Sequence, residues 1–352
     1  MSEQNITFAT SQHCPQIHEI PDDLFRLERA EETGECEVRA AALTFGQDAR
    51  RRLRKNKAAI LSMAILTVVV SLALMAPILA PYNPNTQNIP HANLPPRIPG
   101  LSVNGLNGTV RMRGELVDRY TLAEVPAGLN YTFGTDEFGR DLLSRALHGT
   151  RISLLIAFIA AVLDLTIGLF YGLISAMSGG RTDTVMQRGL EILNGIPSLV
   201  LVVLMLLVFS PGIVSIIFAL TISSWIPMAR IVRAQTLRIK NLEYVQAAKA
   251  LGVSAPAIAL SHVLPNIASI VVVRAMFSIP AAIFFETFLS FIGIGMKLPN
   301  ASLGTLLNSG YKVFRIYSYQ MWIPAVILCV IMLAFNLFAD GLRDALDPKM
   351  KE

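Results

Sequence analysis

The chain has 352 residues, of which 53% are hydrophobic and only 16% are charged. Soluble domains carry about 25% charged residues, so much of this chain must lie in a solvent other than water. The net charge of +5 comes without a basic stripe interleaved with aromatic residues, which argues against a nucleic-acid-binding protein.

Residues 1–57 precede the first apolar run. Residues 1–40 are polar and acidic, and we expect a loosely ordered tail there. The charge reverses in the basic cluster at 50–57, which we interpret as an anchor that keeps this end in the cytoplasm. Binding of nucleic acid or of a specific lipid by this cluster is the alternative. Residues 1–57 are therefore predicted to be a cytoplasmic tail with a basic anchor.

Six apolar runs are long enough to cross a hydrocarbon core of about 30 Å. Each should be a helix, because a helix satisfies its own backbone hydrogen bonds in lipid. Six spans place both termini on one side, and the Lys and Arg clusters fall on that same side, which is therefore predicted to be cytoplasmic. The predicted fold is an all-α membrane protein whose six transmembrane helices are 58–80, 151–177, 190–209, 212–232, 267–292 and 319–340.

The segment 81–150 interrupts this pattern between the first and second spans. Its first part contains many prolines, and the rest mixes polar and β-branched residues. We expect a small external subdomain with some strand pairing. The remaining spans form a core over 151–340, followed by a cytoplasmic tail over 341–352.

The loop 233–266 lies on the predicted cytoplasmic side between two spans. Residues 242–251 favour helix, and Gly252 stands where that helix would end. Residues 253–264 predict a second short helix with Ser254 as its N-cap, after which Pro265 precedes the next span. Two short helices joined at a glycine would form a knob that fits a groove on another protein. A connector lying on the lipid surface is the alternative.

Recognisable catalytic motifs are absent from the sequence. There is no Gly-x-x-x-x-Gly-Lys-Ser/Thr loop, no His-Glu-x-x-His, no Cys-x-x-Cys pair and no Gly-x-Ser-x-Gly. We expect no catalytic residue and no metal site in this chain. If transport requires energy, another polypeptide must supply it.

Several motifs resemble those of one transporter family. The segment from Glu243 to Gly252, followed by Leu264, Pro265 and Asn266, resembles the signature loop of importer-type ABC transporter permeases. Segments 133–145, 290–295 and 336–348 resemble the inner-membrane "C" subunit of dipeptide, oligopeptide and nickel importers. The resemblance covers roughly residues 43–350.

The resemblance implies a set of partners. These are a homologous "B" permease, two ATP-binding subunits, an extracellular or periplasmic substrate-binding protein, and the lipid of a bacterial inner membrane. ATP and Mg would be bound by the partner subunits, so no cofactor is expected in this chain. The residues implied in docking on the ATPases are Glu243, Gln246, Ala247, Ala248, Gly252, Leu264 and Pro265.

Two further features bear on the substrate and on the docking loop. The long 81–150 segment is similar to that of oligopeptide importers, and dipeptides or nickel are the alternatives. The family usually has glutamate just before the two alanines, where this chain has Gln246. An amide keeps hydrogen bonding but cannot form a salt bridge.

Three charged residues lie within predicted spans and are candidates for a translocation pathway: Asp164, Arg274 and Glu286. Asp164 would face the pathway or bond to another helix. Arg274 is expected to extend toward the cytoplasmic surface, and Glu286 to line an external vestibule. A proton-coupled secondary transporter that uses Asp164 and Glu286 is the runner-up, although no inverted repeat supports it. A membrane-anchored sensor or scaffold fits six spans poorly.

Overall fold

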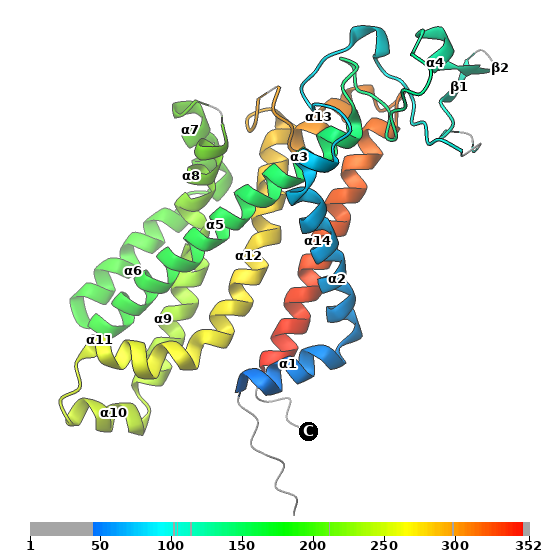
Figure 1. Ribbon diagram of the computed structural model, residues 1–352. Helices are drawn as coiled ribbons and strands as arrows, with labels where there is room; N and C mark the ends of the chain where they lie inside the picture. Colours follow the sequence, from blue (N-terminus) through cyan, green and yellow to red (C-terminus); the bar gives the residue numbers. More distant parts are fainter. Residues whose placement is uncertain are drawn as a thin grey trace, which may run out of the picture. The chain divides into compact units, whose positions relative to one another are not determined.

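The structure is a computed structural model that describes residues 45–100, 103, 105–112, 115–210, 212–297 and 299–347. The predicted acidic tail over 1–40 therefore lies outside the described residues, as does the end of the predicted C-terminal tail. The described part is mostly helical (Figure 1). Its helices are α1 (Phe45–Lys55), α2 (Lys57–Leu74), α3 (Ala76–Leu79), α4 (Arg119–Leu122), α5 (Leu142–Ser178), α6 (Gly180–Gly195), α7 (Ser198–Val208), α8 (Ile213–Ser224), α9 (Ile226–Lys240), α10 (Glu243–Ala250), α11 (Ala255–Ile258), α12 (Leu264–Ile292), α13 (Leu303–Val313) and α14 (Tyr319–Leu346).

Five helical segments of the described chain are long and apolar enough to cross a membrane. They are 57–74, 142–178, 213–240, 255–292 and 319–346, and the bent pair α6–α7 makes a sixth if it is counted as one span. This agrees with the predicted all-α fold. The second span was predicted to begin at 151, but α5 begins nine residues earlier, at Leu142. The side chain of Asp141 caps the helix there by accepting from the Ser144 N–H.

The predicted single span over 190–209 is wrong in one respect. The structure has two helices, α6 and α7, that meet at an angle of 80°. The break lies at Ile196 and Pro197, where Ile196 has an extended backbone with ψ 128°. Proline disfavours helical geometry in the residue before it and has no N–H to donate, so the helix ends here.

Glycines allow α5 and α9 to approach each other closely. A Cβ on Gly168 would lie 2.6 Å from Met228 Cβ, and a Cβ on Gly172 would lie 2.7 Å from Val232 Cβ. The Gly-x-x-x-Gly spacing places both glycines on the face of α5 that meets α9. Met228 and Val232 are buried together with Leu173 in the core of this half of the bundle.

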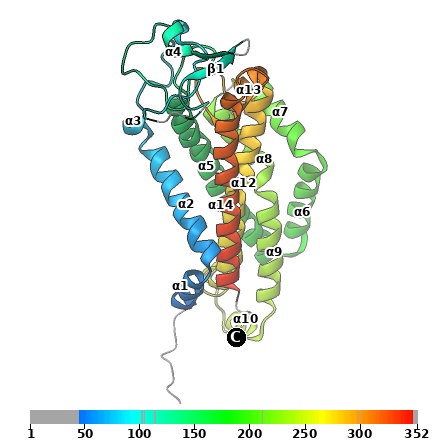
Figure 2. The same cartoon turned by 90° about the vertical axis from the view of Figure 1, so that its right-hand side faces the viewer.

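The helix α14 packs against α2 and α12, and the two views agree on this arrangement (Figures 1 and 2). Gly341 of α14 lies against Ala59 of α2. The helix α10 and the β-hairpin described next lie at opposite ends of the bundle (Figures 1 and 2).

Residues 81–141 form what we call the hairpin subdomain. The strands β1 (Thr109–Met112) and β2 (Glu115–Asp118) pair antiparallel, with Thr109 opposite Asp118, so the expected strand pairing is present. Leu94, Tyr120 and Tyr131 form a small buried core beneath the hairpin. Residues 142–150, which were predicted to belong to this subdomain, are instead the first turns of α5.

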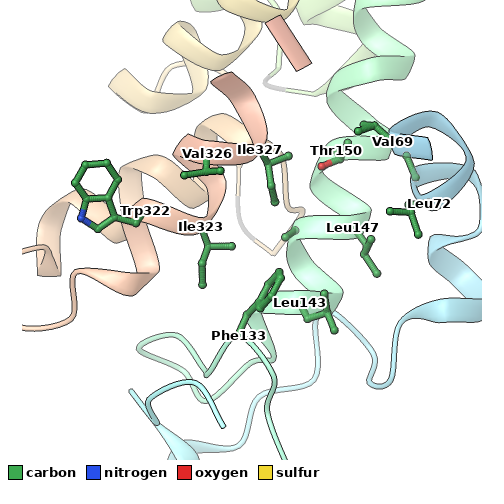
Figure 3. A pocket seen from close by; sticks show the side chains of 12 residues that line it. Val69, Leu72, Phe133, Leu143, Leu147, Thr150, Trp322, Ile323, Val326 and Ile327 are labelled. Atoms are coloured by element: carbon green, nitrogen blue, oxygen red, sulfur yellow. The ribbon is translucent and has the colours of Figure 1, made fainter. Parts of the chain in front are cut away.

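An apolar cavity of about 470 Å³ lies between α2, α5 and α14. Figure 3 shows Val69 and Leu72 of α2 facing Ile323 and Ile327 of α14 across it, with Phe133 of the hairpin subdomain at one side. Thr150 contributes one hydroxyl to an otherwise apolar wall.

Candidate functional site: a docking helix and a polar cavity

The helix α10 is short and has sequence features that favour its formation. Glu243 lies in its first turn and Lys249 in its last, so both charges complement the helix dipole. The chain closes the helix with bonds from Gly252 N to Lys249 O and from Val253 N to Ala248 O, each near 3.0 Å. This is a Schellman motif, and it needs the left-handed backbone that Gly252 adopts at φ +84°. The predicted helix end is confirmed.

Only one side chain of α10 is buried. Val245 packs in the core with Val263 and Ile267. The side chains at Glu243, Gln246 and Ala247 are exposed, and Ala248 is half-buried. Leu251 is 85% exposed, which is unusual for a leucine that is not in lipid. The outer face of α10 is therefore a small surface on which apolar groups lie beside the exposed charges of Glu243 and Lys249, a combination suited to protein interaction.

Two contacts fix the orientation of α10. The amide of Gln246 donates from Nε2 to the carbonyl oxygen of Lys240, at 2.8 Å, at the end of α9. On the other side, the Asn266 amide donates to the Tyr244 hydroxyl at 3.3 Å and to the His262 carbonyl at 2.6 Å. The sequence motifs include Tyr244 and Asn266, but no role was predicted for either.

The second short helix predicted over 253–264 is not a separate element. Helix α11, a π-helical turn (Ala259–Val263) and α12 follow one another without a break in the chain. Pro265 lies in the first turn of α12, directly after the π turn, where a missing N–H is tolerated. Ser254 precedes α11 as predicted, although its side chain makes no capping bond. Leu264 is half-buried and Pro265 is exposed.

A polar cavity of about 440 Å³ lies among the spanning helices. Asp164 of α5 and Arg274 of α12 both line it, together with Ser223 and Ser224 of α8 and Asn194 of α6. Asp164 is only 3% exposed, and the Ser224 hydroxyl donates a hydrogen bond to its Oδ1. The break between α6 and α7 forms one wall of this cavity, which no sequence pattern had indicated.

The structure gives the surroundings of the other two charged candidates, Arg274 and Glu286, and Glu286 differs from its expected position. Arg274 lines the polar cavity, is half-buried, and its Nε is buried without a hydrogen-bond partner among the described residues. Glu286 is fully buried and lines no vestibule. It accepts hydrogen bonds from Ser153 at 2.7 Å and Ser290 at 2.9 Å, and it joins α12 to α5. It does not line the cavity that contains Asp164, which removes support for a two-carboxylate proton relay.

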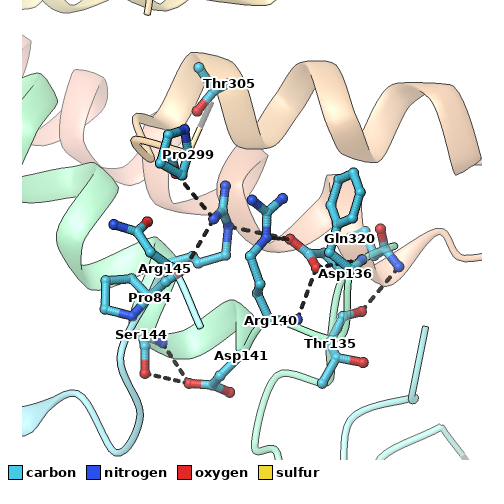
Figure 4. Close-up of polar contacts among 12 residues, drawn as sticks. Pro84, Thr135, Asp136, Arg140, Asp141, Ser144, Arg145, Pro299, Thr305 and Gln320 are labelled. Carbon is cyan, nitrogen blue, oxygen red and sulfur yellow. Dashed lines mark hydrogen bonds and ion pairs between the residues drawn. The ribbon is translucent and has the colours of Figure 1, made fainter. Parts of the chain in front are cut away.

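The segment 133–145 has a structural role at the base of the hairpin subdomain (Figure 4). Asp136 pairs with Arg140, Oδ2 to Nε, at 2.7 Å, and with Arg145 at 3.4 Å, and both arginines are almost fully buried. Arg145 also donates to the carbonyl oxygens of Pro84 and Pro299. These bonds hold three distant segments against the start of α5.

Comparisons with known proteins agree on one family. The model for binding-protein-dependent transport system inner membrane components matches residues 165–352, and the model for the N-terminal TM domain of oligopeptide transport permease C matches residues 44–96. The chain is 43% identical to the dipeptide transport system permease protein DppC of Lactococcus lactis, with 88% of this chain and 92% of that protein covered. In Bacillus subtilis it is 37% identical to DppC, with 99% of each chain covered, and 36% identical to the oligopeptide transport system permease protein OppC, with 96% of this chain and all of that protein covered.

Proposed function

Because this chain belongs to the family of binding-protein-dependent transport system inner membrane components, we propose that it is the membrane-embedded permease subunit of an ATP-driven peptide importer. It forms half of the translocation pathway, and a second, homologous permease forms the other half. A substrate-binding protein delivers the peptide, and two ATP-binding subunits supply the energy. The substrate is an oligopeptide, with dipeptides as the alternative, since relatives of both names match at similar identity.

One observation carries this proposal: α10 is an exposed helix that is bonded to the spanning helices and packed against them. Its outer face, from Ala247 to Leu251, is open to a partner, while Val245 is buried on the inner face. A groove on an ATP-binding subunit that accepts this face would move α10 when it closes on nucleotide. Small side chains at Ala247 and Ala248 favour a close fit.

The contacts around α10 support transmission of that movement into the bundle. Gln246 joins α10 to the end of α9, and the Lys240 ammonium donates to the carbonyl oxygens of Ala176 and Met177 at the end of α5. Arg233 of α9 pairs with Asp183 of α6 at 2.6 Å. A displacement of α10 would therefore carry α9, α5 and α6 as a packed unit, which is how rigid-body rocking exposes a pathway to alternate sides.

The orientation in the membrane follows from the same proposal. ATP is hydrolysed in the cytoplasm, so α10 and both termini face that side, where the Lys and Arg clusters of the sequence are expected. The hairpin subdomain then faces outward, where a substrate-binding protein approaches. The host membrane is that of a bacterial cell.

Substitutions at Gly252 test the proposal in the complete complex, reconstituted in vesicles with its partner subunits. A Cβ on Gly252 meets no described atom of this chain within 4 Å, so a larger side chain adds backbone strain at φ +84° but no clash at the Cβ. We expect Gly252→Trp to abolish ATP-dependent peptide uptake and co-purification of the ATP-binding subunits. Gly252→Asn is the matched control, because asparagine tolerates positive φ and is small, and it should keep most of the uptake.

Gly252→Ala separates backbone strain from size. A left-handed alanine costs about 1 to 2 kcal/mol, so this variant should fall between the other two. Uptake by the tryptophan variant at the wild-type rate, with the ATP-binding subunits still bound, would remove α10 from the docking surface.

A further inference from the structure

The polar cavity lined by Asp164 and Arg274 contains two opposite charges that are not paired with each other. Among the described residues, no ion pair within 4.0 Å joins Arg274 to any carboxylate. Its Nε is buried and has no hydrogen-bond partner. Arg274 as a whole is half-buried, but a buried N–H without an acceptor is costly, because its desolvation is not offset by a hydrogen bond. The site therefore favours a ligand that presents an acceptor with negative charge.

The break between α6 and α7 strengthens the preference for an anionic group. Pro197 and Ser198, at the start of α7, line the cavity. No side chain caps this helix of eleven residues, so its first N–H groups are open to a ligand at the positive end of the helix dipole. Arg274 and the α7 N-terminus thus offer donors from two different walls.

Asp164 gives the same cavity a negative pole. The Ser224 hydroxyl donates a hydrogen bond to Oδ1 of Asp164, and no described residue donates to its Oδ2. A free anion such as chloride would be repelled by this carboxylate, and a free cation would be repelled by Arg274. Both charges are satisfied together by a ligand that carries an ammonium and a carboxylate.

From these contacts we propose that the cavity is a binding site for the peptide itself within the permease. Arg274 and the α7 N-terminus bind its terminal carboxylate, and Asp164 binds its terminal ammonium. Ser223, Ser278 and Asn194 supply neutral hydrogen-bonding groups along the cavity wall. The inference rests on the proposed peptide import and adds that the permease, besides the substrate-binding protein, selects free termini.

The test uses the complete reconstituted complex and three probes: a tripeptide, its C-terminal amide and its N-acetyl derivative. Maximal uptake rates are measured with the binding protein saturated by each probe, so that its own affinity does not enter the comparison. The wild type should move the free tripeptide faster than either derivative. Arg274→Gln should slow the free tripeptide and the N-acetyl derivative by about tenfold and leave the amide unchanged.

Asp164→Asn should slow the free tripeptide and its C-terminal amide but leave the N-acetyl derivative unchanged. It should therefore remove the preference for the free tripeptide over the N-acetyl derivative and keep the preference over the amide. Arg274→Lys keeps the charge but loses the planar, two-pronged geometry, so it should retain part of the carboxylate preference. Arg230→Gln, an exposed arginine of α9, is the control and should change none of the three rates.

The outcomes separate this inference from the function on which it rests. If the wild-type complex moves no peptide, the proposed peptide import and the terminus-binding site are both refuted. If it moves all three probes equally, or if Arg274→Gln and Arg274→Lys slow all three probes to the same extent, peptide import stands and the terminus-binding site is refuted. An unchanged preference in Arg274→Gln refutes it as well.

Discussion

Replacing Gly172 with alanine should weaken the contact between α5 and α9. The added Cβ would lie 2.6 Å from the carbonyl oxygen of Ala229 and 2.7 Å from Val232 Cβ. Carbon atoms in ordinary contact are about 3.5 to 4.0 Å apart, so the two helices must separate by about 1 Å. Both neighbours are backbone or branched at Cβ, and neither can turn away.

The expected magnitude is a difference between two effects. Overpacking a well-packed contact costs about 1 to 3 kcal/mol. Removing a glycine from the interior of a helix recovers about 0.5 to 1 kcal/mol. The net loss of unfolding free energy should therefore be about 0 to 2.5 kcal/mol, and the loss relative to an uncrowded glycine-to-alanine change should be about 1 to 3 kcal/mol.

Gly189→Ala is the matched control in α6. Its added Cβ would have the Tyr171 hydroxyl at 3.6 Å as its nearest neighbour, which is an ordinary contact. The same chemical change should there be neutral or stabilising. Denaturant titration of the two purified variants in one detergent gives the comparison. If Gly172→Ala proves as stable as Gly189→Ala, the close approach of α5 and α9 does not depend on glycine.

The remaining predictions concern the two ends of the bundle. Gln246→Glu removes the donor to the Lys240 carbonyl and places an anion at the negative end of the α9 dipole. Amide hydrogen exchange in 243–250 should therefore accelerate about fivefold. Unchanged exchange would show that this hydrogen bond does not hold α10 in place. In the hairpin subdomain, burial lowers the pKa of His91 below its ordinary 6.5, and its Nδ1 accepts from the Asn88 amide only while neutral. The stability that His91 contributes is therefore complete above about pH 6.5 and shrinks as the pH falls below it. Protection of the amides in 88–135, after correction for the intrinsic pH dependence of exchange, should fall between pH 7 and pH 5 in the wild type but not in His91→Gln, and an equal fall in both would contradict this assignment.

The sequence predicted the features that depend on local pattern. Apolar runs located most of the spanning helices, and Gly252 marked the end of α10. Each of these signals is carried by residues within a few positions of one another, so no tertiary information is needed to recognise it.

The features that sequence reasoning missed depend on partners distant in the chain. Segment 142–150 was assigned to the external subdomain, because nothing in the sequence shows that Arg145 is buried against the carbonyls of Pro84 and Pro299. Likewise, Glu286 was expected in a vestibule, whereas Ser153 and Ser290 surround it. A buried charge is recognisable only when its hydrogen-bond partners are known.

The helix α9 connects the two parts of the candidate site. Its last residue, Lys240, accepts from Gln246 of α10, and its first turn contains Pro227, which lines the polar cavity. Because α9 is one continuous helix packed closely against α5 at Gly172, a displacement of its end is expected to reach its first turn. A tilt imposed on α10 would therefore change the wall of the cavity that contains Asp164 and Arg274. On the proposed function, nucleotide-driven closure outside the membrane would in this way alter the affinity for a peptide between the spanning helices.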